Sequence, residues 1–400
     1  MLRPSLALTL GIAALASAKQ APLPFSQPEA LLTYPSDILP AAASKELLYL
    51  HRHLVEIESI TENELEVGKW LASYLESKNF TVEMQEVSPK RFNILAYWGK
   101  TSKTPVLVSS HIDTVPPFWP YKYNHTSGII SGRGSVDAKG SVAAQIIALL
   151  SLQEDLPHSA VSLLFVVGEE TGGDGMRYFS TNAPHSYDAV IFGEPTEGKL
   201  VCGHKGMLAF TVKVQGKAAH SGYPWLGVSA NDVLAEALDN IIKLRQHLPW
   251  SEKYGNTTIN IGRVEGGVAA NVVAETAKAQ FAVRLAAGTP TVIKGMIVGA
   301  LQGVKSRVEG LGGGLEIEWG SEGYPPVDIN CDVKGFDKIT VNYGTDIPNL
   351  EGIHKRYLYG PGSIFVAHSD HEALKVEELE TAVIDYKKLI LAALEKQKRM

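Results

Sequence analysis

The sequence lacks the features that define several large classes of protein. Cysteine occurs only at Cys202 and Cys331, which stand far apart and form no cysteine-rich motif, so a zinc site built from thiolates is excluded. The formal net charge is -6, and without a basic excess we expect no nucleic-acid partner. No stretch approaches ~20 consecutive apolar residues, which argues against a membrane span. The Gly-x-Ser-x-Gly motif of serine hydrolases is also absent.

The N-terminus has the three parts of a secretory signal. Arg3 supplies the charged start, residues 6–15 form a short apolar stretch, and an Ala-Ser-Ala sequence ending at Ala18 fits a cleavage site. The apolar stretch is too short for a comfortable membrane anchor. We therefore expect a signal peptide over residues 1–18 and a secreted, extracellular protein. Residues 19–43, rich in Pro and Ala and without periodicity, are expected to form a leader or loosely held arm.

Two further features agree with export. Asn79, Asn124 and Asn256 each begin an Asn-x-Thr tripeptide, which is an acceptor for glycosylation in a host that secretes through an endoplasmic reticulum. Cys202 and Cys331 are an even number of cysteines, as an oxidising compartment favours. The sequence leaves open whether they form a disulfide or remain two buried thiols.

The 400 residues, 45% of them hydrophobic, suffice for more than one globular domain. After a first amphipathic helix at residues 45–57, strands and helices alternate. This pattern predicts an α/β sheet with helices on both faces. The expected helices are 62–77, 138–152, 176–181 and 376–396, and the expected strands are 80–87, 92–98, 106–110, 161–167 and 189–192.

The middle of the chain follows a different pattern. Strands are expected at 209–215, 258–264, 277–285 and 315–319, with helices at 228–244 and 291–308. This βαββαβ order is the ferredoxin-like arrangement. We therefore predict a catalytic domain in two parts, 44–205 and 320–400, with a lid or dimerisation domain, 206–319, inserted between them.

Histidines and acids follow the predicted strands of the larger domain, where ligands of open α/β sheets bind. They occur in five segments bounded by turn residues: 109–116, 132–140, 167–173, 192–195 and 360–370. His111 and Asp113 lie two residues apart, so both point to one side of a strand end. His111 can be a metal ligand with Asp113 holding its second ring nitrogen. Of the adjacent pair Glu169 and Glu170, one can bind metal while the other acts as a base.

Each short motif also has a commonplace interpretation. A single His-x-Asp or Glu-Glu pair is usually surface charge, and Gly132 and Gly134 lack the third glycine of a dinucleotide-binding turn. Five such segments, each after an apolar strand, are not explained by surface charge. Their nitrogen and oxygen donors suit zinc, with manganese or cobalt as alternatives.

These motifs resemble the dinuclear zinc peptidases and deacylases grouped with acetylornithine deacetylase, succinyl-diaminopimelate desuccinylase, glutamate carboxypeptidase and aminoacylase. The resemblance runs from about Lys45 to Lys396 and is most specific in segments 109–116 and 132–140 and at the sequence Gly-Glu-Glu that ends at Glu170. It implies an α/β/α catalytic domain of the zinc-exopeptidase type with the ferredoxin-like lid, and two zinc ions per subunit.

The resemblance also assigns roles residue by residue. Asp137 is similar to the carboxylate that bridges both metals, and Asp113 and Glu169 to the orienting carboxylate and the general acid/base. The implied metal ligands are His111 and Glu194 for one ion, Glu170 and His368 for the other, and Asp137 for both. His371 lies near His368, but only His368 stands at the family's spacing. Ser135, where relatives often have Ala, is a small departure.

The lid resembles the family in three places. His220 is similar to a histidine that reaches the active site of the partner subunit and helps to hold the oxyanion. Asn271 and Arg284 are similar to lid residues that contact substrate. Their commonplace interpretations are a turn at a strand end and a surface cation. The histidine's role implies a homodimer formed through the lid, with a monomer as the alternative.

The predicted function is hydrolysis of the amide bond of peptides, most simply as a secreted carboxypeptidase. An N-acyl-amino-acid deacylase or a dipeptidase shares all these catalytic residues and remains open. A protein that binds metal without turnover is the non-enzymatic alternative. It would be expected to have lost the base, yet Glu169 and Asp113 are both present. The expected partners are therefore a peptide or N-acyl-amino-acid substrate, with no nucleic acid and no membrane.

Overall fold

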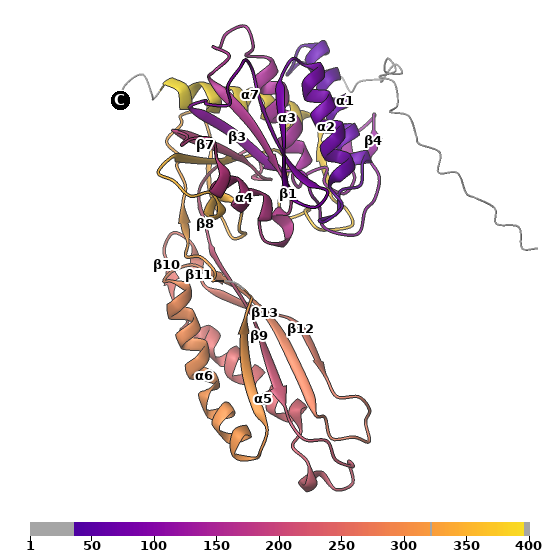
Figure 1. Cartoon of the computed structure of the whole chain (residues 1–400), viewed down its shortest axis with the longest axis vertical. Coiled ribbons are helices and arrows are strands. Elements are labelled where there is room, and N and C mark those ends of the chain that lie inside the picture. Colours follow the sequence, from indigo (N-terminus) through magenta and orange to yellow (C-terminus); the bar gives the residue numbers. More distant parts are fainter. Residues whose placement is uncertain (1–35, 321, 396–400) are drawn as a thin grey trace, which may run out of the picture.

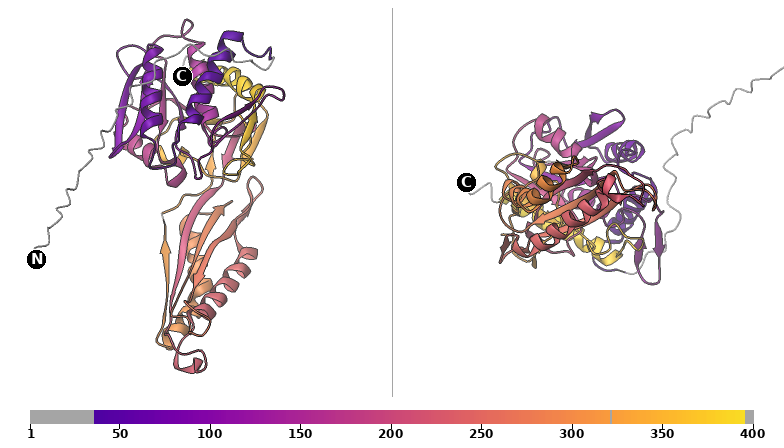
Figure 2. Two further views of the ribbon diagram at one scale, coloured as in Figure 1. Left: turned by 90° about the vertical axis from the view of Figure 1, so that its right-hand side faces the viewer. Right: turned by 90° about the horizontal axis from the view of Figure 1, so that it is seen from below.

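Two sheets of different construction organise the chain in the computed structural model, which describes residues 36–320 and 322–395. A large α/β body carries an elongated second body that projects from one side (Figures 1 and 2). The predicted signal, 1–18, lies outside the described residues, as does the predicted arm up to residue 35. Within the described residues, no helix has the length and apolarity needed to cross a bilayer.

The large sheet has six strands in the order β1-β2-β6-β3-β7-β17. The central strands β6, β3, β7 and β17 run parallel, whereas the pairs β1–β2 and β2–β6 are antiparallel. All residues of β3 and β6 are buried, as a sheet covered on both faces requires. The strands are β1 (Thr81–Ser88), β2 (Arg91–Tyr97), β3 (Val106–His111), β6 (Val161–Val166), β7 (Ala189–Gly193) and β17 (Lys355–Tyr359).

Helices cover both faces of this sheet. Leu163 and Phe165 of β6 pack into the core formed with α1, α2, α3 and α7. Their neighbours Leu164 and Val166 point to the opposite face and pack with α4. The helices are α1 (Ala41–Glu56), α2 (Leu65–Ser77), α3 (Lys139–Leu150), α4 (Asp174–Asn182) and α7 (Val376–Glu395).

Two helix starts differ from the sequence prediction. Helix α1 begins at Ala41, so assigning residues 41–43 to a loose arm is wrong. These residues are alanines, which extend a helix by intrinsic propensity without adding any apolar periodicity. Helix α2 begins at Leu65 and not at Glu62, because Glu62 has a positive φ of 80°, which a right-handed helix does not allow.

Two small sheets complete the large body. They are β15-β8-β16, with β15 (Val327–Asp328), β8 (Leu200–His204) and β16 (Lys338–Val341), and β18-β5-β4, with β18 (Ala373–Lys375), β5 (Ile129–Ser131) and β4 (Lys122–Asn124). Strands this short carry too little alternation to be recognised from sequence, and none of them is among the predicted strands.

The projecting body is an antiparallel sheet in the order β12-β13-β9-β14. Its two helices pack against one face, and the residues of β9 and β13 alternate between that core and the exposed face. The elements are β9 (Gly206–Gln215), α5 (Ala230–Leu244), β12 (Thr258–Gly266), β13 (Thr276–Leu285), α6 (Pro290–Gly310) and β14 (Gly314–Trp319). This is the predicted βαββαβ lid, and the predicted fold class is confirmed.

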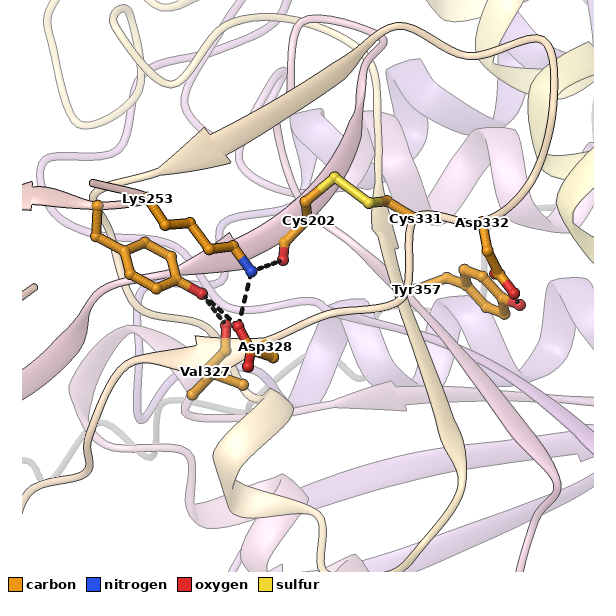
Figure 3. The surroundings of a disulfide bond; sticks show 8 residues. Cys202, Lys253, Val327, Asp328, Cys331, Asp332 and Tyr357 are labelled. Carbon is orange, nitrogen blue, oxygen red and sulfur yellow. Dashed lines mark hydrogen bonds and ion pairs between the residues drawn. A yellow bond between two sulfur atoms is a disulfide. The ribbon is translucent and has the colours of Figure 1, made fainter. Parts of the chain in front are cut away.

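A disulfide joins the two segments of the chain that connect the large body to the lid. Cys202 in β8 precedes the lid and Cys331 follows it, and their sulfur atoms are bonded (Figure 3). Beside the bond, Lys253 donates hydrogen bonds to the Cys202 carbonyl and to Asp328, both at 2.7 Å. Lys253 lies in the lid hairpin of β10 (Trp250–Ser251) and β11 (Gly255–Asn256). The root of the lid is thus fixed by one covalent and several polar contacts.

Replacing both cysteines by alanine is expected to destabilise the protein. The bond closes a separation of 129 residues, for which the chain-entropy model gives about 5 kcal/mol. The thermal unfolding midpoint of the double variant, measured by calorimetry, should therefore fall. Reducing the unmodified protein is the control and should give the same shift. An unchanged midpoint would show that the bond contributes nothing to the folded protein.

Candidate metal centre

The five predicted metal ligands gather at the carboxyl ends of the parallel strands. His111 is the last residue of β3, and Glu194 directly follows β7. Glu170 belongs to the 3-10 turn Glu169–Thr171 after β6. Asp137 precedes α3, and His368 lies in the loop after β17. Because parallel strands end at one edge of the sheet, residues far apart in sequence meet there.

Asp137 lies at the centre of the cluster. Its Oδ1 atom is 3.1 Å from His111 Nε2, and its Oδ2 atom is 3.2 Å from His368 Nε2. His111 Nε2 also lies 3.8 Å from Glu194 Oε1, and His368 Nε2 lies 3.0 Å from Glu170 Oε2. The two oxygens of one carboxylate therefore face two separate His–Glu sets. This is the arrangement that a bridging carboxylate between two cations requires.

The donor set fits divalent metal ions. Ligand atoms of His111, Asp137 and Glu170 lie within 4.8 Å of one another, as do those of His111, Glu169 and Glu194. All are imidazole nitrogens or carboxylate oxygens, the donors of zinc, manganese and cobalt sites. Glu170 Oε1 is buried and has no hydrogen-bond partner. A buried carboxylate oxygen without a partner is costly unless it binds a cation.

Negative charge accumulates in the cluster. Burial, together with the neighbouring Asp137 and Glu170 carboxylates, raises the pKa of Glu194 to about 7. Burial and Glu194 raise the pKa of Glu169 well above its usual value. Hydrogen bonds to Asp137 and Glu170 raise the pKa of His368 to about 10. Carboxylates whose pKa is raised by burial and by like charge indicate a site that is stabilised by added positive charge.

Asp113 holds the turn that carries Glu169 and Glu170. Its Oδ1 accepts a hydrogen bond from Glu169 N at 3.1 Å, and its Oδ2 accepts one from Glu170 N at 3.3 Å. Thr61 Oγ1 donates to the same carboxylate at 2.7 Å. His111 Nδ1 lies 3.5 Å from Asp113 Oδ1 but 3.0 Å from the Asp113 carbonyl oxygen. Asp113 therefore contacts the predicted ligand histidine mainly through its backbone and the Glu-Glu turn through its side chain.

The structure adds Glu372 to this site. The buried Glu372 carboxylate accepts hydrogen bonds from Val136 N at 3.0 Å and Asp137 N at 3.1 Å and pairs with Arg133 Nη1 at 2.6 Å. It thus holds the backbone of the central carboxylate from the loop that follows His368. Its position four residues after His368 was the only sequence signal. Asp346, also missed, is buried near His111 and Glu194 with one oxygen unpartnered.

Glu372→Gln is expected to weaken both folding and metal binding. The substitution keeps the shape of the side chain but leaves the buried Arg133 guanidinium without its counter-charge, which costs about 3 kcal/mol in comparable buried pairs. Loss of a group that orients a ligand lowers metal affinity by about 10- to 100-fold. Denaturant unfolding and metal titration measure the two effects. Metal affinity equal to that of the unmodified protein would contradict this role.

The predicted lid residues lie in two different places. Arg284 is near the end of β13 closest to the large body, where a Cβ on Gly344 would be 3.5 Å from its Nη1 atom. Gly344 is two residues from Asp346, so Arg284 lies beside the site. Asn271, exposed in the loop before β13, lies at the opposite end, and its carbonyl accepts a hydrogen bond from Ser221 N at 3.1 Å.

His220 is at the same far end, since it pairs with Val272. The strand from Thr276 to Arg284 spans ~27 Å at ~3.4 Å per residue. The lid therefore holds His220 and Asn271 away from the metal cluster of their own chain. Figure 2 shows that the lid itself extends away from the large body. Of the three predicted lid residues, the structure brings only Arg284 close to the metal cluster; His220 and Asn271 lie far from it.

The remaining predicted residues lie apart from the cluster. The exposed His371 ring contacts its neighbour Asp370 at 2.9 Å. Asn79, Asn124 and Asn256 are exposed, so their side chains are accessible to glycosylation, which stays a prediction.

Comparisons with known proteins agree with this fold. Residues 202–305 match the family model for the peptidase dimerisation domain, and residues 93–193 match that of peptidase family M28. A "probable carboxypeptidase" of Arthroderma otae is 50% identical over 405 residues, covering 91% of this chain and 89% of the relative. One of Aspergillus flavus is 52% identical over 382 residues, covering 88% of each.

Solved structures share the fold at lower identity. A tripeptidase of Staphylococcus aureus superimposes with a TM-score of 0.72 and 23% identity, over 88% of this chain and 98% of that one. An M20 family metallo-carboxypeptidase of Sulfolobus solfataricus gives 0.66 and 18%, over 87% and 99%. Fold and site define a metallopeptidase. The chain belongs to the M20-type family of zinc metallopeptidases, which confirms the resemblance inferred from its motifs.

Proposed function

We propose that this metallopeptidase is a carboxypeptidase with two zinc ions per subunit. The observation that carries the proposal is the Asp137 carboxylate, whose two oxygens face His111 at 3.1 Å and His368 at 3.2 Å. His111 and Glu194 would hold one ion, and Glu170 and His368 the other, with Asp137 shared. Cobalt or manganese has the same donor preferences and is a possible substitute. The names of the fungal relatives support cleavage at the carboxyl terminus of peptides.

The residues around the cluster would divide the chemical work. Bound metal ions would supply Lewis acidity, which activates water for attack and polarises the scissile carbonyl. Glu169, partly exposed beside the ligands, would take a proton from the attacking water and deliver it to the leaving amine. Asp113 keeps Glu169 in place through the Glu169 backbone N–H. Arg284, at the root of the lid, would pair with a substrate carboxylate.

Peptides with modified ends test the proposed specificity. A mass-spectrometric time course should show sequential loss of C-terminal residues from a free peptide and from its N-acetylated form. Amidation of the C-terminus should abolish cleavage, because the carboxylate that Arg284 would bind is gone. Release of N-terminal residues, or cleavage of dipeptides alone, would contradict a carboxypeptidase. Release of only the acetyl group from N-acetyl-amino acids would indicate a deacylase.

Export and pairing of two chains complete the proposal. The disulfide between Cys202 and Cys331 supports an oxidising compartment, since such bonds form mainly in exported proteins. The match of residues 202–305 to a dimerisation domain supports a homodimer through the lid. Detection of the glycosylated protein in culture medium tests the proposed export. Its absence there, with the protein retained inside cells, would contradict secretion.

A further inference from the structure

The turn that carries Glu169 begins at a residue of unusual conformation. Gly168 has a φ of 74°, in the left-handed region that residues with a Cβ seldom adopt. The two N–H groups that follow, of Glu169 and Glu170, are bound by Asp113. The side chain of Asp113 therefore fixes one side of this turn.

Arg91 lies against the other side of the turn. A Cβ on Gly168 would be only 2.6 Å from Arg91 Nη2, so the guanidinium packs directly against the glycine. Arg91, the first residue of β2, is itself held by Glu64: its Nη2 donates to Oε1 at 2.7 Å and its Nε to Oε2 at 3.0 Å. Glu64 is 1% exposed and Arg91 9%. The guanidinium is therefore fixed by a two-pronged, buried ion pair.

One short segment supports both sides of the turn. Thr61 donates to Asp113, and Glu64, three residues later, pairs with Arg91. Asp174 adds a longer, solvent-exposed contact, at 3.4 Å from Arg91 Nη1. Removing a single member of a buried ion pair leaves an uncompensated charge, so the Glu64–Arg91 pair resists displacement. A guanidinium also presents a flat, rigid face, which an ammonium group does not.

We propose that Arg91 is a positioning residue for catalysis. It fixes the backbone at Gly168, and thereby holds the Glu169 carboxylate at the distance from the metal cluster that proton transfer requires. Arg91 does not touch the reacting atoms, and its effect is exerted through the turn. The inference rests on the proposed role of Glu169 as the proton carrier.

Steady-state kinetics at saturating metal test this role, so that weakened ligation by Glu170 does not obscure the result. Arg91→Lys keeps the charge but loses the flat, two-pronged contact, and kcat should fall at least tenfold with KM changed less than threefold. The double variant Glu64→Leu, Arg91→Leu removes both charges together. Its thermal midpoint should stay near that of the unmodified protein, whereas its kcat should stay low. Asp174→Ala, the matched control on the exposed side of the same arginine, should leave kcat and KM unchanged.

The outcomes separate positioning from stability. If the double variant has both the thermal midpoint and the kcat of the unmodified protein, Arg91 has only a structural role and the inference is wrong. The same conclusion follows if Arg91→Lys keeps kcat within twofold of the unmodified protein. Glu169→Gln is assayed in parallel. Full activity of that variant would overturn the proposed role of Glu169 and this inference with it. An inactive Glu169→Gln beside a fully active Arg91→Lys would overturn the inference alone.

Discussion

Glu169→Gln is expected to lower kcat by about 10²- to 10⁴-fold, the usual contribution of a positioned acid/base group, while folding and metal content should stay unchanged. The amide has the size of the carboxylate but cannot accept a proton from water at neutral pH. Its backbone N–H still binds Asp113, so the turn and the neighbouring Glu170 are expected to remain in place. Turnover of a short peptide and elemental analysis of the same samples measure the two quantities.

Asp137→Asn is the control for this experiment. It removes the charge shared by the two His–Glu sets and should lower metal content, which Glu169→Gln should not do. Retention of activity within about tenfold in Glu169→Gln, a loss of less than ~1.4 kcal/mol of transition-state stabilisation, would show that another group carries the proton. Glu194 and Asp346 are the buried acids near the site that such a result would then bring into question.

Two inactive variants are expected to restore activity when they are mixed. His220→Ala and Glu169→Gln should each lose most turnover, because His220 would act in the site of the neighbouring subunit. The ~27 Å strand between the two ends of the lid makes a contribution to its own site impossible in this conformation. In a mixed dimer, one of two sites combines an intact Glu169 with an intact His220. Random exchange at equal concentrations should therefore recover about one quarter of full activity.

Native mass spectrometry provides the control by counting mixed dimers in the same sample. Formation of mixed dimers without any recovered activity would rule out action in trans. A monomer with full activity would remove the dimer from the mechanism altogether. A control variant should replace an exposed lid histidine outside the His220 loop, and His247 is such a residue. His247→Ala should be active by itself, without mixing. The buried His51 is unsuitable for this comparison.

The sequence predicts that His111, Glu170 and Glu194 meet, because each ends or closely follows a buried, apolar parallel strand. His111 ends β3 and Glu194 follows β7, and strand ends of a parallel sheet converge whatever their separation in the chain. The supporting residues could not be found this way. Glu372 binds the backbone of Asp137 across 235 residues, and a single sequence does not indicate such pairs.

Other contacts between residues distant in the chain could not be predicted for the same reason. Arg91 starts an ordinary strand, and only the structure shows its guanidinium beneath Gly168. The lid pattern predicts its elements but not their placement, so the separation of Arg284 from His220 is a finding of the structure. The disulfide between Cys202 and Cys331 was one of two open possibilities, because a spacing of 129 residues favours neither.

Metal titration of the apo-protein tests the central claim, a site that two ions share through Asp137, most directly. Activity should rise with added zinc and saturate at two bound ions per chain, measured by elemental analysis of the same samples. Asp137→Asn should saturate at lower content, since it weakens the ligand common to both sites. Full activity at one bound ion per chain, with no further gain from a second, would contradict the shared site.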